Sequence, residues 1–183
     1  GDEETRVEGL RVLSRFAGQD SVGLVSGLMK GASPRAQMEA VNTLRATSGK
    51  SAEEALLAAV ASDNPDLRYA AIEALGERGD RAAVPALVSA AGDTNERVRC
   101  AAVEALGRLG DAAGLDAIAS AWEKGPDKVK QASVTACLEI ANGLLAKGDK
   151  TKANAVFQQV ADRAATESDR ITAIDGIGRS GLA

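Results

Sequence analysis

The sequence predicts an all-α solenoid in which about five and a half antiparallel helix pairs stack along one axis. Two series of apolar positions recur every 31 residues: Ala36, Leu67, Val98 and Val129 form one, and Leu13, Leu44, Leu75 and Leu106 form the other. Aromatic residues make up only 2% of the chain while alanine is abundant, and alanine favours helices that pack closely. No alternating run rich in Val, Ile and Thr indicates a strand.

The third helix pair shows the pattern most clearly. Asn64 is a suitable N-cap, and Pro65 suits the first helical turn, where its missing N–H has no partner to lose. The apolar residues between Leu67 and Leu75 then fall on one face of a helix. We expect the chain to turn at Gly79 and to return as a second, antiparallel helix.

The other pairs follow in order along one solenoid domain. We expect units at about residues 5–32, 33–63, 64–94, 95–125, 126–166 and 167–183. The first unit should turn at Gly18-Gln19-Asp20, and the first helix of the fifth unit should continue to Gly148, which makes that unit longer. The last unit has no second helix to cover its face, so we expect these residues to be a segment of a longer protein.

Two stretches resemble HEAT repeats. They run from Asn64 to Gly76 and from Val98 to Gly107, and each is followed by a Gly-Asp turn. More narrowly, they resemble the short bacterial HEAT-like class found in phycobilisome lyase subunits. Residues 144–157 resemble a tetratricopeptide hairpin inserted between HEAT units. The resemblance implies a right-handed superhelix whose second helices line a concave face. It implies no particular reaction, because this scaffold serves many roles.

The charge and composition of the chain limit the kinds of partner that we expect. The net charge is −4, and an acidic chain is poorly suited to binding phosphates in general. No apolar run reaches the roughly 18 residues that a membrane span requires, so we expect no membrane insertion. The acidic start of the chain does not resemble a targeting segment. We expect a soluble protein of the bacterial cytoplasm or periplasm, and the sequence leaves the choice open.

A column of mostly basic residues occupies one position of the first helices. Its members are Arg6, Gln37, Arg68, Arg99, Lys130 and, in the last unit, Arg170. One interpretation is a structural ladder, in which these side chains bond to neighbouring turns through acceptors such as Asp63, Asp93 or Asp127. The other is a row that binds anions. A parallel column of Glu73, Glu104 and Asp175 is interpreted as a solvated face.

Trp122 is the only tryptophan. Its register partners are apolar, which favours packing at the end of a second helix. If it were exposed near the concave rim, it would instead anchor a partner, together with the adjacent Glu123 and Lys124. These three residues are the candidate binding residues. Cys137 takes the place of Leu106 and Leu75, so we interpret it as a small buried hydrophobe.

The sequence contains few of the residue arrangements that catalysis requires. The chain has no histidine, so Ser/His/Asp and Cys/His arrangements are absent, and no phosphate-binding Gly-rich loop occurs. We therefore expect no enzyme, no cofactor, no metal and no specific small-molecule ligand. The leading hypothesis is a scaffold that binds a protein partner or a flanking domain through its concave face and loops. The alternatives are an accessory subunit of a chromophore lyase and, more weakly, a nucleic-acid-binding protein.

Overall fold

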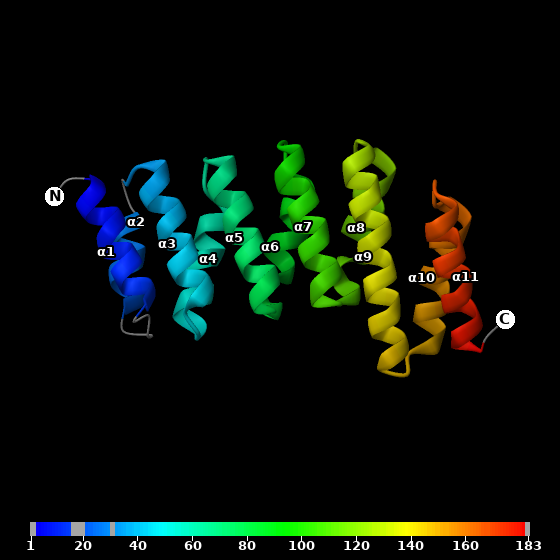
Figure 1. Cartoon of the computed structure of the whole chain (residues 1–183). Helices are drawn as coiled ribbons and strands as arrows, with labels where there is room; N and C mark the ends of the chain where they lie inside the picture. The colour runs from blue at the N-terminus through cyan, green and yellow to red at the C-terminus, as the bar shows by residue number, and fades with distance from the viewer. Residues whose placement is uncertain (1–2, 16–20, 30–31, 182–183) are drawn as a thin grey trace. The chain divides into compact units, whose positions relative to one another are not determined.

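The computed structural model describes residues 3–15, 21–29 and 32–181. These residues form eleven α-helices and two short 3₁₀ turns, and they contain no strand (Figure 1). The chain divides into two compact units, residues 1–86 and 87–183. The expected turn at Gly18-Gln19-Asp20 lies outside the described residues.

The first unit contains the first five helices and the start of the sixth. Their bounds are α1 (Glu3–Arg15), α2 (Val22–Met29), α3 (Pro34–Ala46), α4 (Lys50–Val60), α5 (Pro65–Arg78) and α6 (Val84–Ala90), which crosses the boundary between the units. Helix α3 packs between α1 and α5, so that first helices lie next to first helices. The core of this unit includes Leu10, Leu44, Leu56 and Leu75, each fully buried.

The second unit contains the remaining helices. They are α7 (Glu96–Leu109), α8 (Leu115–Lys124), α9 (Asp127–Ala146), α10 (Lys150–Arg163) and α11 (Glu167–Ser180). Helix α9 packs against α7, α8 and α10, and α11 packs mainly on α10. Leu106, Ile118, Ile140 and Phe157 are fully buried in this core.

Local sequence signals account for the ends of these helices. The Asn64 side chain accepts a hydrogen bond from the Asp66 N–H at 3.0 Å, as an N-cap should. Gly79 ends α5 with φ +73°, a left-handed conformation that glycine adopts without steric cost. The expected extension of the fifth unit is confirmed, because α9 runs for 20 residues before the turn at Gly148.

Burial confirms the register derived from the 31-residue period. Leu44, Leu75 and Leu106 are all 0% exposed, and Cys137 is 1% exposed at the equivalent place in α9. Burial raises the pKa of the Cys137 thiol to about 11, so the thiol stays protonated and serves as a packing group.

Candidate functional site

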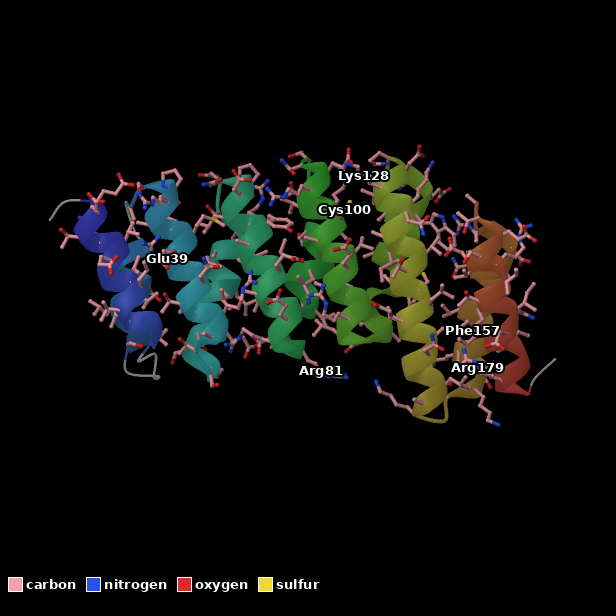
Figure 2. All side chains as sticks on the ribbon, viewed as in Figure 1. Glu39, Arg81, Cys100, Lys128, Phe157 and Arg179 are labelled. Atoms are coloured by element: carbon pink, nitrogen blue, oxygen red, sulfur yellow. The ribbon has the colours of Figure 1, made fainter. Side chains whose placement is uncertain are left out.

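A groove with a volume of about 910 Å³ lies between the first helices α7 and α9 of the second unit. Asn95 starts α7 by accepting hydrogen bonds from the N–H groups of Arg97 and Val98, and Pro126 precedes the first residue of α9. Figure 2 shows Cys100 of α7 and Lys128 of α9 near the same end of these helices. We call this hollow the α7–α9 groove.

At Gly107 the helices α7 and α9 approach each other closely, and this contact closes the groove there. A Cβ added to Gly107 would lie 2.6 Å from the Cα of Ala136, so only glycine allows α9 to pack this closely on α7. Cys100, Ala132 and Ala136 line the groove with small side chains. The hollow therefore exists because small residues, rather than large apolar ones, lie between the two helices.

Charged side chains line the groove in two groups. Near the N-terminal ends of the helices are Glu96, Arg97 and Lys128, which together carry one net positive charge. About three turns further along are Glu104, Arg108 and Glu139, which together carry one net negative charge. The groove thus has two ends of opposite sign. A ligand that matches it needs an anionic group and a cationic group at a corresponding separation.

The pKa values of two groups in the groove, the Cys100 thiol and the Glu139 carboxyl, are raised. Burial raises the pKa of the Cys100 thiol above its ordinary value, and the carboxylates of Glu104 and Glu96 raise it further. Partial burial raises the pKa of the Glu139 carboxyl; Arg108 opposes this effect and Glu104 reinforces it. A thiol held in its protonated form is a weak nucleophile. The shift at Cys100 therefore makes this thiol a poor nucleophile.

Two further features, a metal-binding cluster and a membrane-spanning helix, were not found in the part of the chain that the structure describes. No cluster of three or more His, Cys, Asp or Glu residues there could hold a metal ion. None of its helices is both long enough and apolar enough to span a bilayer.

Trp122 lies in the interior of the second unit. It is 6% exposed, and the Arg163 guanidinium lies over its ring at 4.8 Å from the ring centre. This burial fits the packing interpretation of Trp122. Glu123 and Lys124 are exposed at the end of α8. Lys124 also lines a smaller hollow of about 430 Å³, with Val88, Ala117 and Ser120 from the second helices.

The basic column bonds to the backbone at three of its positions. Arg68 Nη1 donates to the carbonyl oxygens of Ser62 and Asp63 at 2.9 and 3.1 Å. Arg99 Nη1 donates to those of Asp93 and Thr94 at 2.6 and 3.1 Å, and Arg170 Nη2 donates to that of Ala164 at 3.1 Å.

Each of these arginines therefore joins its helix to the loop just before it. Asp63 and Asp93, two of the acceptors suggested from the sequence, accept these hydrogen bonds through their backbone carbonyl oxygens. The side chains of Arg6 and Lys130, the other two residues of the expected ladder, are exposed.

Sequence reasoning interpreted Glu104 as part of a solvated column and did not identify the groove that it lines. Cys100, Lys128 and Glu139 were not candidates, because no sequence motif links them. Two signals were present in the sequence: the glycine at 107 and the extended fifth unit. Neither shows by itself that α7 and α9 leave a hollow on one side of their contact.

Comparison with known proteins supports the repeat interpretation. Residues 53–139 match the family model for HEAT repeats, which confirms the resemblance over that stretch. No curated protein matches the sequence significantly.

Among solved structures, the protein is similar to one chain in the complex of CpcE and CpcF of phycocyanin lyase from Nostoc sp. PCC7120, with a TM-score of 0.61 and 19% identity over 86% of this chain and 98% of that one. It is also similar to human deoxyhypusine hydroxylase, with a TM-score of 0.60 and 20% identity over 92% and 65% of the two chains. A third similar structure is a computationally designed armadillo repeat protein for modular peptide recognition, with a TM-score of 0.58 and 18% identity over 97% and 94%. At these identities the matches show the fold alone, which is that of HEAT and armadillo solenoids.

Proposed function

Because residues 53–139 match HEAT repeats, we propose that this protein is a non-catalytic scaffold that binds an extended segment of a partner protein in the α7–α9 groove. The observation that carries the proposal is the groove itself, with small residues between α7 and α9 and two charged groups of opposite sign. A designed repeat protein of the same fold class was made for peptide recognition, which supports a partner of this kind.

The dimensions of the groove suit a short segment. Lys128 and Glu139 are 11 positions apart on α9, which corresponds to about 16 Å along a helix. An extended chain advances about 3.3 Å per residue, so about five residues span this length. We infer that the partner segment places an acidic side chain beside Arg97 and Lys128 and a basic side chain beside Glu104 and Glu139.

Panning a phage-displayed library of random heptapeptides against the chain tests this proposal. A Cys100→Trp variant, which fills the groove with a large ring, serves for counter-selection. Peptides that carry an acid and a base about five residues apart should be enriched on the parent chain and lost on the variant. Enrichment that the variant does not affect, or no enrichment at all, would contradict the proposal.

A pair of charge variants then locates the contact. Lys128→Glu reverses a charge at the groove. It should lower the affinity for the selected peptides by about tenfold, mainly by slowing their association. Lys124→Glu makes the same change at the end of α8 and should leave affinity unchanged. If only Lys124→Glu weakens binding, the partner occupies the second-helix side, which the family resemblance places on the concave face.

The groove volume favours a second candidate function. A volume of about 910 Å³ lies within the range of about 300–1,000 Å³ that is usual for small-molecule pockets. An accessory subunit of a chromophore lyase would hold a linear tetrapyrrole there. A thermal-shift measurement with a bilin tests this candidate function. The bilin should raise the melting temperature of the parent chain and leave that of Cys100→Trp unchanged.

A further inference from the structure

Two hollows beside the second helices lie at the same register of the repeat. One, of about 300 Å³, is in the first unit, and the other is the hollow of about 430 Å³ beside Lys124 in the second unit. An offset of 62 residues, twice the 31-residue period, relates their lining positions. The corresponding pairs are Ser26 and Val88, Gln37 and Arg99, Ala55 and Ala117, Ala58 and Ser120, Ala59 and Ala121, and Ser62 and Lys124. The hollow is therefore a property of the repeat. We call the one in the second unit the Arg99 hollow.

Alanines line both hollows. They are Ala55, Ala58 and Ala59 in the first unit and Ala91, Ala117 and Ala121 in the second. Because these side chains are small, they leave a space that a larger residue would fill. The methylene groups of a ligand can lie on this apolar surface without displacing a residue of the protein.

The two hollows differ in charge. The first unit presents the neutral side chains of Gln37 and Ser62, whereas the second presents two cations, Arg99 and Lys124, at the same positions. Asp93 also lines the Arg99 hollow, and its carboxylate accepts a hydrogen bond from the Asn95 N–H at 2.8 Å. The charged residues of the Arg99 hollow therefore sum to one net positive charge.

The cations of the Arg99 hollow have donors to spare. The bonds of Arg99 to the loop before α7 use only Nη1, and they hold the guanidinium in place. Its Nε and Nη2, like the Lys124 ammonium, make no hydrogen bond or ion pair within the described residues. Two cations that line one hollow repel each other, and an anion bound between them would offset that repulsion. A carboxylate suits this arrangement, because a guanidinium binds it with charge-assisted hydrogen bonds.

We propose that the Arg99 hollow binds the side chain of a glutamate from a partner protein. The carboxylate would lie between Arg99 and Lys124, and the two methylene groups would lie on the alanines. Ser120 and Lys124 are exposed, so the rest of the partner segment can continue over the surface of α8. This hollow lies beside the second helices, whereas the α7–α9 groove lies between first helices, so the proposal does not depend on the groove.

A peptide titration followed by NMR tests the proposal. The probe is acetyl-Ala-Ala-Glu-Ala-Ala-amide, added to the ¹⁵N-labelled full chain, and the signals are the backbone amides of residues 120–125. The shifts should saturate. The same peptide with glutamine in place of glutamate should bind at least about tenfold more weakly, because a neutral amide lacks the attraction to two cations.

Two variants give the Arg99 hollow the residues of its counterpart in the first unit. Arg99→Gln and Lys124→Ser should each weaken the glutamate peptide by about fivefold or more. Lys147→Ser removes an exposed lysine at the end of α9 and should leave the affinity unchanged. Circular dichroism melting checks that the variants fold. Lys124 is exposed, so Lys124→Ser keeps the test decisive even if Arg99→Gln destabilises the chain.

Absence of saturable shifts, equal binding of the glutamine peptide, or binding that neither Arg99→Gln nor Lys124→Ser weakens would overturn the proposal. Free glutarate or inorganic phosphate that bound as tightly as the peptide would overturn it as well, and would assign the hollow to small anions. The peptides of the phage selection are chosen for their loss on Cys100→Trp, so they report on the α7–α9 groove. The two proposals can therefore fail separately.

Discussion

Helices α5 and α7 carry the same repeat motif and end in the same left-handed glycine, at Gly79 and Gly110, yet different chemistry secures their last turns. The residue before the glycine is Arg78 in the first unit and Leu109 in the second. Leu109 is 6% exposed and packs as an apolar group. The side chain of Arg78 is almost as buried, at 12%, and it satisfies polar groups instead.

The hydrogen bonds of Arg78 connect α5 to the turn between α3 and α4. Its guanidinium donates to the carbonyl oxygens of Leu44, Thr47 and Gly49, and its Nε lies 2.5 Å from a carboxylate oxygen of Asp80. Thr47 caps the end of α3 and Gly49 precedes α4, and the carbonyl oxygens of Leu44 and Gly49 also accept hydrogen bonds from the N–H groups of Thr47 and Glu53. The repeat register thus determines that a position is buried. The neighbouring backbone determines whether a leucine or an arginine can occupy it.

The comparison requires that the two helices be equivalent, and Leu75→Asp tests this most severely. Leu75 of α5 and Leu106 of α7 are both 0% exposed. An unpartnered carboxylate at either place should lower the free energy of unfolding by on the order of 5 kcal/mol. Urea unfolding followed by circular dichroism measures the loss. If the Leu75→Asp chain unfolded like the parent, the register used here would be wrong.

A second change asks how far the stability of the second unit depends on Phe157, one of its two buried aromatic side chains. Phe157 is 0% exposed, and the described residues of the first unit bury no aromatic side chain. Phe157→Ala should cost about 4 kcal/mol, because it opens a cavity between α10 and α11. Trp122 is the only tryptophan and lies in the second unit, so its fluorescence reports this loss directly. An unchanged fluorescence transition would show that the ring contributes little.

Replacing Arg78 by leucine makes the first unit resemble the second at this turn. We expect Arg78→Leu to cost about 3 kcal/mol, since the Thr47 carbonyl and the Asp80 carboxylate would lose this donor while remaining largely buried. Arg78→Lys keeps the charge but not the planar fork, so it should recover only part of the loss. Equal stability of Arg78→Leu and the parent in urea would mean that packing alone secures both turns.

Two glycines on α11 give a matched pair within the second unit. A Cβ at Gly176 would lie 2.5 Å from the Phe157 ring, whereas one at Gly178 meets nothing. Gly176→Ala should therefore destabilise the fold by about 2 kcal/mol through overpacking. Gly178→Ala should stabilise it by up to about 1 kcal/mol through helix propensity. Thermal melting of the two variants distinguishes these effects, and a loss in both would contradict the assigned packing.

The smallest effect concerns pH. The folded state raises the pKa of Glu139 above its ordinary value of 4.5, so folding favours the protonated carboxyl. Stability should therefore decline as pH rises from 4.5 through the folded-state pKa, because ionisation is less favourable in the folded protein than in the unfolded chain. Glu139→Gln should remove this decline. The decline is measured by comparing the unfolding midpoints of variant and parent at several pH values. Identical pH profiles of the two chains would contradict this prediction.

Much of the fold could be predicted from the residues because helical repeats are specified locally. Asn64, Pro65 and Gly79 mark the ends of α5, and the buried column through Leu44, Leu75 and Leu106 follows from the period. The candidate site could not be predicted in the same way. Glu104 and Glu139 are 35 residues apart in sequence, and only the packing of α7 on α9 makes them neighbours in one groove.

The sequence by itself determined that this protein is built from paired helices, where a helix such as α5 begins and ends, and which residues of the 31-residue series face the interior, because capping and periodicity act over a few residues. Only the tertiary structure decided that Trp122 lies in the interior and that Arg78 replaces a leucine by bonding to a neighbouring turn. It also decided that α7 and α9 leave a charged groove beside Gly107. These features depend on the distance between helices, which small side chains at the contact set and which no local pattern encodes.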